Sequence, residues 1–151
     1  TEIGNHILIG SEDPECDERI FVDPDNWDDN FSDQWNTQVL RQAQRYPNLP
    51  ISSKVKGVVS LYDVSDDWIP IYDKSDLPGF YMAIGTSGNQ YKNAPVAGVL
   101  MSELIEYCEN GNDHDISPLN VNLKHINTDI SLAFYSRNRK INKESSMSVL
   151  G

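Results

Sequence analysis

The segment 79–108 constrains the fold more than any other part of this chain of 151 residues. It begins with an apolar run, 79–85, continues through a polar stretch, 86–93, and then carries Pro95 at the start of a second apolar sequence. Proline is favoured in the first turn of a helix, and Gly111 supplies a stop signal at the far end. The pattern predicts a strand, a tight turn and a helix in direct succession.

A turn of this kind presents unpaired backbone N–H groups, together with the positive end of the helix dipole, to an anion or an electron-rich atom. Gly85 and Gly88 would allow a planar ring or a phosphate to approach the backbone closely. The spacing of Gly79, Gly85 and Gly88 fits neither G-x-G-x-x-G nor G-x-x-x-x-G-K-[ST]. Spacing alone therefore leaves a ligand-binding turn and a purely structural turn both open.

The rest of the chain alternates between extended and helical patterns. Apolar residues at three- and four-residue spacing predict an amphipathic helix over 31–46, with Asn30 as its N-cap and an end at Pro47. Apolar and β-branched runs predict strands at 6–10, 55–62, 68–72 and 130–135. The residues before 6 are too few to pair with the first of these strands, and 11–30 reads as a surface loop. The expected class is α+β (mixed α/β).

The charge balance excludes some classes of partner. Twelve Lys and Arg against 23 Asp and Glu give a formal net charge of −11, which repels both nucleic-acid phosphates and anionic lipids. The apolar runs are far shorter than the ~20 residues of a spanning helix, and the N-terminus lacks the pattern of a signal peptide. We expect a cytoplasmic protein that binds neither nucleic acid nor membranes.

Other motifs for chemistry are weak. The stretch 23–34 resembles a calcium loop only faintly, because Asp28 stands where glycine is required and Gln34 where glutamate is required. Ser87 lacks the G-x-S-x-G elbow of a nucleophile. No metal site is predicted, because the cysteines and histidines show no metal-ligand spacing; these are Cys16, Cys108, His6, His114 and His125.

Residues 77–95 read Leu-Pro-Gly-Phe-Tyr-Met-Ala-Ile-Gly-Thr-Ser-Gly-Asn-Gln-Tyr-Lys-Asn-Ala-Pro, and Gly98 and Glu-Leu-Ile at 103–105 follow. This run resembles the C-terminal flavin signature of the D-amino acid oxidase superfamily, which includes sarcosine oxidase, glycine oxidase and dimethylglycine dehydrogenase-like proteins. The similarity extends upstream through 61–71 to the apolar run 7–11, and it covers about residues 5 to 110.

The resemblance implies an FAD-dependent oxidoreductase that oxidises a C–N bond of an amine or (N-alkyl) amino acid by hydride transfer to the flavin. The turn would lie against the isoalloxazine ring, with backbone amides that stabilise negative charge on its pyrimidine side. On this basis the residues assigned to cofactor binding are Gly85, Thr86, Ser87, Gly88, Asn89, Gln90, Tyr91 and Lys92.

Three side chains receive further roles from the resemblance. Lys92 matches a lysine near the flavin and the substrate carboxylate, which implies a catalytic role in anion binding or oxygen activation; a solvent-facing lysine is the alternative. Tyr62 would line the substrate cavity, and packing in the core is the alternative. Ser60 stands near the cysteine that bonds the flavin in some sarcosine oxidases, so FAD would be bound noncovalently. Asn89-Gln90 replaces the His-Gly of several relatives, which leaves the substrate class and the electron acceptor open.

The family architecture places an ADP-binding βαβ unit well before such a segment, so the chain is interpreted as a C-terminal portion that lacks the N-terminal flavin domain. Residues 1–75 would belong to the substrate-binding domain with its antiparallel sheet, 76–111 to the FAD-binding domain, and 112–151 to an extension. Alone the chain would be inactive, and unpaired strand edges would favour self-association. Two alternatives remain, a noncatalytic binding module of the same fold and an FAD-dependent 2-hydroxy-acid dehydrogenase.

Overall fold

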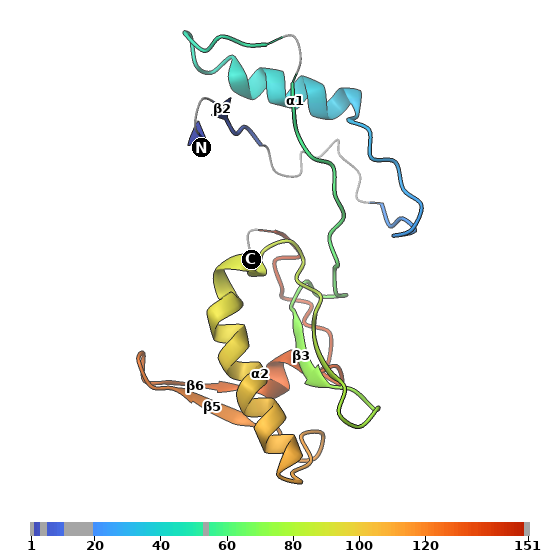
Figure 1. Cartoon of the computed structure of the whole chain (residues 1–151), viewed down its shortest axis with the longest axis vertical. Coiled ribbons are helices and arrows are strands. Elements are labelled where there is room, and N and C mark those ends of the chain that lie inside the picture. Colours follow the sequence, from blue (N-terminus) through green and yellow to red (C-terminus); the bar gives the residue numbers. More distant parts are fainter. Residues whose placement is uncertain (1, 4–5, 11–19, 53–54, 150–151) are drawn as a thin grey trace. The chain divides into compact units, whose positions relative to one another are not determined.

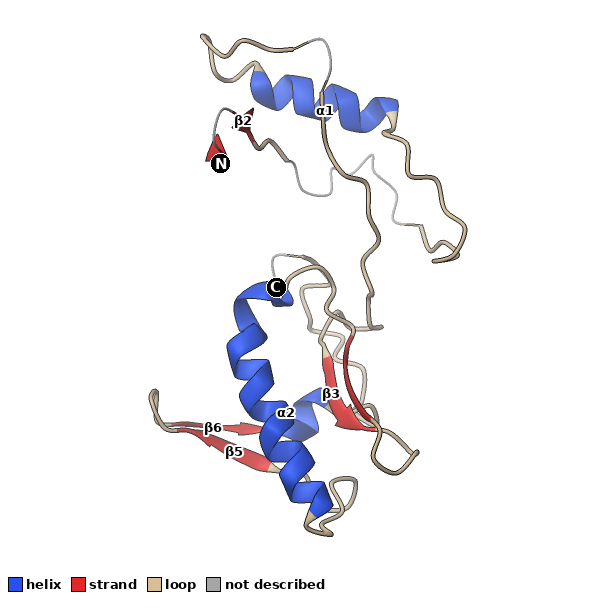
Figure 2. Ribbon diagram, viewed as in Figure 1, coloured by secondary structure: helices blue, strands red, loops and turns tan. Residues whose placement is uncertain are grey.

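The computed structural model describes residues 2–3, 6–10, 20–52 and 55–149, in two compact units that span Thr1–Leu61 and Tyr62–Gly151 (Figure 1). Both α-helices and antiparallel two-stranded sheets are present, so the predicted mixed α+β class is confirmed (Figure 2). Cys16 and much of the predicted loop 11–30 lie outside the described residues. In the part of the chain that is described, no helix is both long and apolar enough to cross a membrane.

The first unit begins with a short antiparallel pair, β1 (Glu2–Ile3) and β2 (His6–Ile7). The prediction that too few residues precede residue 6 to form a hairpin was wrong, because strands of two residues need little chain. Helix α1 spans Asp33–Ala43 and ends before the predicted limit at Pro47. Its N-cap is Ser32, whose hydroxyl accepts a hydrogen bond from the Trp35 amide at 3.0 Å. The predicted cap, Asn30, instead donates its amide to the Asp28 carboxylate at 3.0 Å.

The rings of Phe31 and Trp35 stack at 4.1 Å beside the chain at Gly57. A Cβ at Gly57 would lie 2.9 Å from the Trp35 ring, so only glycine fits at this crossing. The predicted strand 55–62 is not formed by the described residues. An extended sequence becomes a strand only where a second strand supplies hydrogen-bond partners, and no strand among the described residues pairs with this segment.

The second unit contains the predicted strand–turn–helix. Strand β3 (Ile71–Lys74) pairs antiparallel with β4 (Tyr81–Ile84), a 3₁₀-helix η1 spans Gln90–Asn93, and helix α2 runs over Ala94–Glu109. β3 starts later than the predicted strand 68–72, because Trp68 closes a turn onto the Ser65 carbonyl with φ of 59°. The predicted domain boundary between residues 75 and 76 falls in the loop of this hairpin, within the second unit.

The core of this unit lies between α2, β3 and a second hairpin that the sequence analysis missed. Strands β5 (Asn120–Leu123) and β6 (Thr128–Ser131) form that hairpin, and the 3₁₀-helix η2 (Leu132–Tyr135) follows it. Of the predicted strand 130–135, residues 130 and 131 therefore belong to β6, and 132–135 form η2. The side chains that form the buried cluster come from β3, α2, β5 and η2 and are Tyr72, Leu100, Leu104, Val121 and Leu132.

Candidate functional site

The turn between β4 and η1 is held by one carboxylate from another part of the chain. The amides of Gly85 and Thr86 donate to Oδ2 of Asp63 at 2.9 and 3.1 Å. The Thr86 hydroxyl donates to Oδ1 of the same carboxylate, and the Ser87 amide donates to the Asp63 backbone carbonyl at 3.1 Å. Three consecutive amides of the turn are thus satisfied by Asp63 alone.

These hydrogen bonds also set the charge of Asp63. Partial burial by itself would raise the pKa of the carboxyl, but the bonds from the Thr86 hydroxyl and from the Thr86 and Gly85 amides outweigh burial, so the pKa lies below its ordinary value. A carboxylate that accepts several N–H and O–H donors is stabilised in its ionised form. Asp63 is therefore charged at neutral pH, with its charge directed into the turn.

The backbone of the turn adopts unusual angles that explain its composition. Gly85 and Gly88 have φ of 67° and 76°, and Ser87, which is not a glycine, has φ of 49°. The Ser87 side chain is fully buried and donates to the Gly85 carbonyl at 3.2 Å. Left-handed conformations are strained for residues with a Cβ and persist where surrounding contacts fix them. Ser87 thus supports the turn from within, a role that sequence analysis did not separate from ligand contact.

Tyr62 lies against the same turn. A Cβ placed on Gly88 would be 2.7 Å from Cε1 of the Tyr62 ring, so the ring covers the glycine directly. Tyr62 is still 59% exposed, which leaves most of the ring open to a ligand. The structure therefore brings together Tyr62 and the turn, although 26 positions separate Tyr62 from Gly88 in the sequence. The contact also shows that the lack of a side chain at Gly88 is needed within the chain itself.

The second half of the turn faces outward. In the described part of the chain the amide of Gly88 has no acceptor, and the first amides of η1, at Gln90 and Tyr91, have none within their helix. The side chains of Tyr91 and Lys92 are exposed, Tyr91 to 97%. Gly88, Tyr91 and Lys92 are thus exposed parts of one short segment.

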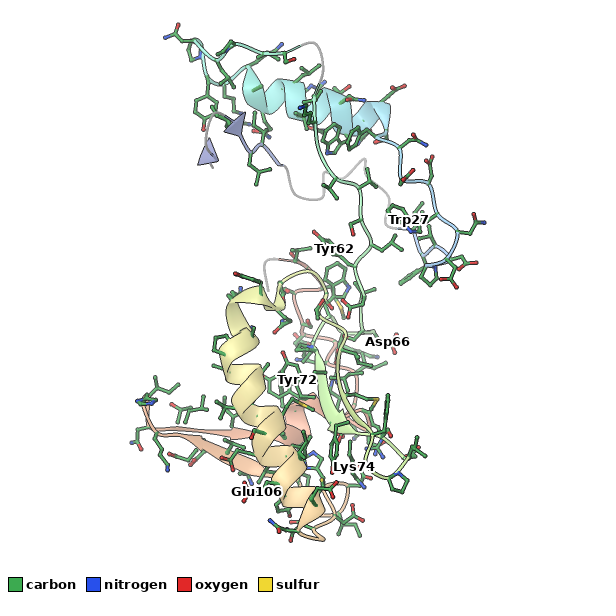
Figure 3. The ribbon with its side chains drawn as sticks, viewed as in Figure 1. Trp27, Tyr62, Asp66, Tyr72, Lys74 and Glu106 are labelled. Atoms are coloured by element: carbon green, nitrogen blue, oxygen red, sulfur yellow. The ribbon has the colours of Figure 1, made fainter. Side chains whose placement is uncertain are left out.

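The Gln90 side chain is oriented inward. Its carbonyl oxygen accepts from the Tyr72 hydroxyl at 3.2 Å and from the Asn93 amide group at 2.9 Å. Figure 3 shows Tyr72 on β3, between that strand and α2. This pair anchors η1 to the buried core, so Gln90 offers a ligand its backbone amide and not its side chain. Asn89, which accepts from the Gln90 side chain, is tied to the same group.

A second polar cluster connects β3 with the segment after η2 and has a structural role. Asp73 is fully buried and accepts from the Ser136 hydroxyl at 3.0 Å and from the Arg137 amide at 2.8 Å. Arg137 also bridges Asp115 at 2.8 Å and Asp76 at 2.6 Å. The hydrogen bonds that Arg137 donates to these carboxylates, above all to Asp115, hold the pKa of Arg137 above its ordinary value. The segment after η2 is thereby fastened to β3.

A cavity of the second unit lies away from the turn. It has a volume of about 690 Å³ and lies between the β3–β4 loop and the C-terminal end of α2, where Lys74, Tyr81 and Cys108 contribute to its lining. Tyr62 and Lys74 lie near opposite ends of α2 (Figure 3). None of the predicted site residues lines this cavity, so it lends no weight to their roles.

Sequence analysis assigned no role to Asp63, the residue that organises the turn. Asp63 is separated from Gly85 by 22 positions, and an aspartate in a polar stretch between two extended segments has no local signature. One sequence signal did point to such a residue. The turn-forming residues over 85–88 have backbone amides that need an acceptor from outside the turn.

No protein-family model, curated protein sequence or solved structure matches this chain. The resemblance to the D-amino acid oxidase superfamily therefore stays a prediction from the sequence of the strand–turn–helix and its upstream segment.

Proposed function

We propose that this chain is the C-terminal portion of an FAD-dependent oxidoreductase that oxidises a C–N bond of an amine or (N-alkyl) amino acid. The observation that carries the proposal is the turn after β4, in which Asp63 accepts the amides of residues 85–87 and leaves those of Gly88, Gln90 and Tyr91 to a ligand. Such a group of donors suits an electron-rich heteroaromatic edge that gains negative charge during reaction.

The chemistry of the donors fits an isoalloxazine ring. Bound FAD would accept a hydride from the carbon next to the substrate nitrogen. The amides of Gly88 and Gln90 would donate to the oxygen and nitrogen of the pyrimidine side, and Lys92 would add a positive charge nearby. The negative charge of Asp63 is stabilised by the hydrogen bonds that it accepts, so it would weaken the attraction of the turn for an electron-rich ring only a little.

Tyr62 and Lys92 would serve the substrate. Tyr62 keeps most of its ring exposed beside Gly88, where it would contact the apolar part of an amine. Lys92 is exposed on η1, where its ammonium group would bind a carboxylate of an amino acid substrate or favour the reduction of oxygen. Lys92 lies on η1 with the amides of Gln90 and Tyr91, and Tyr62 contacts the turn at Gly88.

The outer face of α2 supports the view that further protein covers this unit. α2 buries Leu100 and Leu104 in the core, yet Val96 and Val99 are 39% and 46% exposed. A Cβ on Gly98 would have nothing within 4 Å, so no contact within the described residues accounts for a glycine inside this helix. A helix that is apolar on most of its circumference is typical of a buried position.

The proposal is tested on the product of the complete coding sequence that contains this chain. The purified protein should show a flavin absorption band that bleaches when an N-alkyl amino acid is added without oxygen. A colourless protein that fails to take up added FAD would support the noncatalytic module instead. Bleaching by 2-hydroxy acids, with no response to amines, would identify the dehydrogenase alternative.

A further inference from the structure

Asp63 concentrates an unusual number of donors on one residue. Its carboxylate accepts two amides and one hydroxyl, and its carbonyl accepts a third amide, all from Gly85, Thr86 and Ser87. Three of the four residues from Gly85 to Gly88 have positive φ, which is strained only at Ser87 because the two glycines carry no Cβ. The Ser87 amide is one of the donors that Asp63 holds.

We propose that Asp63 is the positioning residue of the flavin-contacting turn, an inference that rests on the function proposed above. By occupying the amides of residues 85–87, Asp63 fixes which amides stay available, namely those of Gly88, Gln90 and Tyr91. It also sets their direction, because Gly88 follows the last pinned residue and η1 begins two residues later. Asp63 itself reaches no ligand and acts only through the turn.

An isosteric substitution separates positioning from charge. In Asp63→Asn the side-chain oxygen can still accept from the Gly85 and Thr86 amides, and the new NH₂ group can donate to the Thr86 hydroxyl oxygen. In Asp63→Ala all of these bonds are lost, and two amides and a hydroxyl must find water. If Asp63 positions the turn, the asparagine variant should keep the geometry of the turn and the alanine variant should lose it.

The matched control is Asp66→Ala. Asp66 is an exposed aspartate in the same loop, three positions away, and is labelled in Figure 3. Its substitution removes the same charge from the same loop without touching the turn. Any effect shared by Asp63→Ala and Asp66→Ala therefore reports on general electrostatics or loop stability.

The first measurement is hydrogen exchange in this chain, without cofactor. Asp63→Ala should speed exchange at the amides of Gly85 and Thr86, which use the carboxylate, whereas Asp63→Asn and Asp66→Ala should leave it close to wild type. Unchanged protection in Asp63→Ala would overturn the inference. Loss of protection over all of α2 in that variant would do the same, because it would indicate general unfolding.

The second measurement is FAD affinity in the complete protein, by titration of the flavin-free form. Asp63→Ala should raise the Kd on the order of 10-fold or more, the scale typical of residues that orient direct ligands, and shift the absorption band of the residual bound flavin. Asp63→Asn should bind FAD almost as wild type. If Asp63→Asn binds FAD as weakly as Asp63→Ala while its amides stay protected from exchange, the charge of Asp63 and not its positioning of the turn determines FAD affinity. A wild-type protein that does not bind FAD refutes the proposed function, and hydrogen exchange still decides whether Asp63 holds the turn.

Discussion

The Nε2 atom of His114 lies 3.8 Å from Oδ1 of Asp73, and neither side chain is exposed to solvent. Nδ1 of the same ring accepts a hydrogen bond from the Leu119 amide at 3.1 Å, so the neutral ring carries its proton on Nε2, toward Asp73. Burial lowers the pKa of His114 below its ordinary value, and the negative charges of Asp73 and Asp115 oppose this only in part. A second proton on Nδ1 would break the bond to Leu119.

The first prediction concerns pH. Because the pKa of His114 is below 6.5 in the folded chain and near 6.5 in the unfolded chain, the unfolded state binds the proton first. His114 therefore does not lower the free energy of unfolding above about pH 6.5. As the pH drops from there toward the folded pKa, the free energy of unfolding falls by at most about 1.4 kcal/mol per pH unit. Urea unfolding from about pH 8 to about pH 5 should show this loss.

The substitution His114→Asn should flatten this part of the profile, because the asparagine oxygen can accept from the Leu119 amide and does not titrate. His125→Asn, at an exposed position, is the control and should leave the profile of the wild type intact. A His114→Asn profile as steep as that of the wild type would assign the pH dependence to other groups.

The second prediction concerns Arg139, whose guanidinium binds Asp67 in a bidentate manner. Nε and Nη2 lie 3.0 and 2.5 Å from the two carboxylate oxygens, and Asp67 is 1% exposed. Arg139→Ala leaves this buried carboxylate unpaired and should lower the free energy of unfolding by about 3–5 kcal/mol. The neighbouring exposed Lys140→Ala should change it by less than about 0.5 kcal/mol. Adding Asp67→Asn to Arg139→Ala should recover part of the loss, as urea midpoints would show.

Local sequence signals predicted the elements of the second unit better than their connections. The helix α2 and strand β4 follow from apolar periodicity, Pro95 and Gly111, all of which act within a few residues. The pairing of Asp63 with the turn after β4, or of Asp73 with Arg137 across 64 positions, leaves no local trace, because any aspartate in a polar stretch would look the same. These long-range pairs decide which amides of the candidate site face outward.

The strand predicted at 55–62, which is not formed by the described residues, also shows that local sequence does not determine long-range pairing. Its valines and alternating pattern describe a segment that favours extended backbone, and the described residues there are indeed free of helix. Whether an extended segment joins a sheet depends on a partner strand elsewhere. Sequence patterns near Val58 or Leu61 carry no information about that partner.

The third prediction concerns the contact between Gly88 and Tyr62. Gly88→Ala would place a Cβ 2.7 Å from the Tyr62 ring at φ of 76°, so it combines a clash with backbone strain. The strain alone costs roughly 1–2 kcal/mol. In Tyr62→Ala the clash is absent, so Gly88→Ala should cost less in that background than in the wild type. Equal costs in a double-mutant cycle of urea unfolding would contradict the contact.

The fourth prediction uses Gly98 to examine the outer face of α2. A Cβ there meets nothing within 4 Å, so Gly98→Ala should stabilise this chain by about 0.5–1 kcal/mol through helix propensity. In the complete protein the same substitution should be destabilising, because the added methyl group would meet the protein that covers this face. Thermal unfolding of both forms makes the comparison. Stabilisation in both would argue that the face is open to solvent.

The last prediction concerns Lys92 in the complete, flavin-loaded protein. Lys92→Met keeps most of the apolar stem and removes the ammonium group, so the protein should still bind FAD, with a weaker affinity, while kcat/KM for an amino acid substrate falls on the order of 10-fold or more. The loss should be smaller for an amine without a carboxylate if Lys92 binds that group, and equal for both if Lys92 assists the reduction of oxygen. Lys124→Met, at an exposed position between β5 and β6, is the control and should retain full activity. Full activity of Lys92→Met with both substrates would leave Lys92 as a surface lysine.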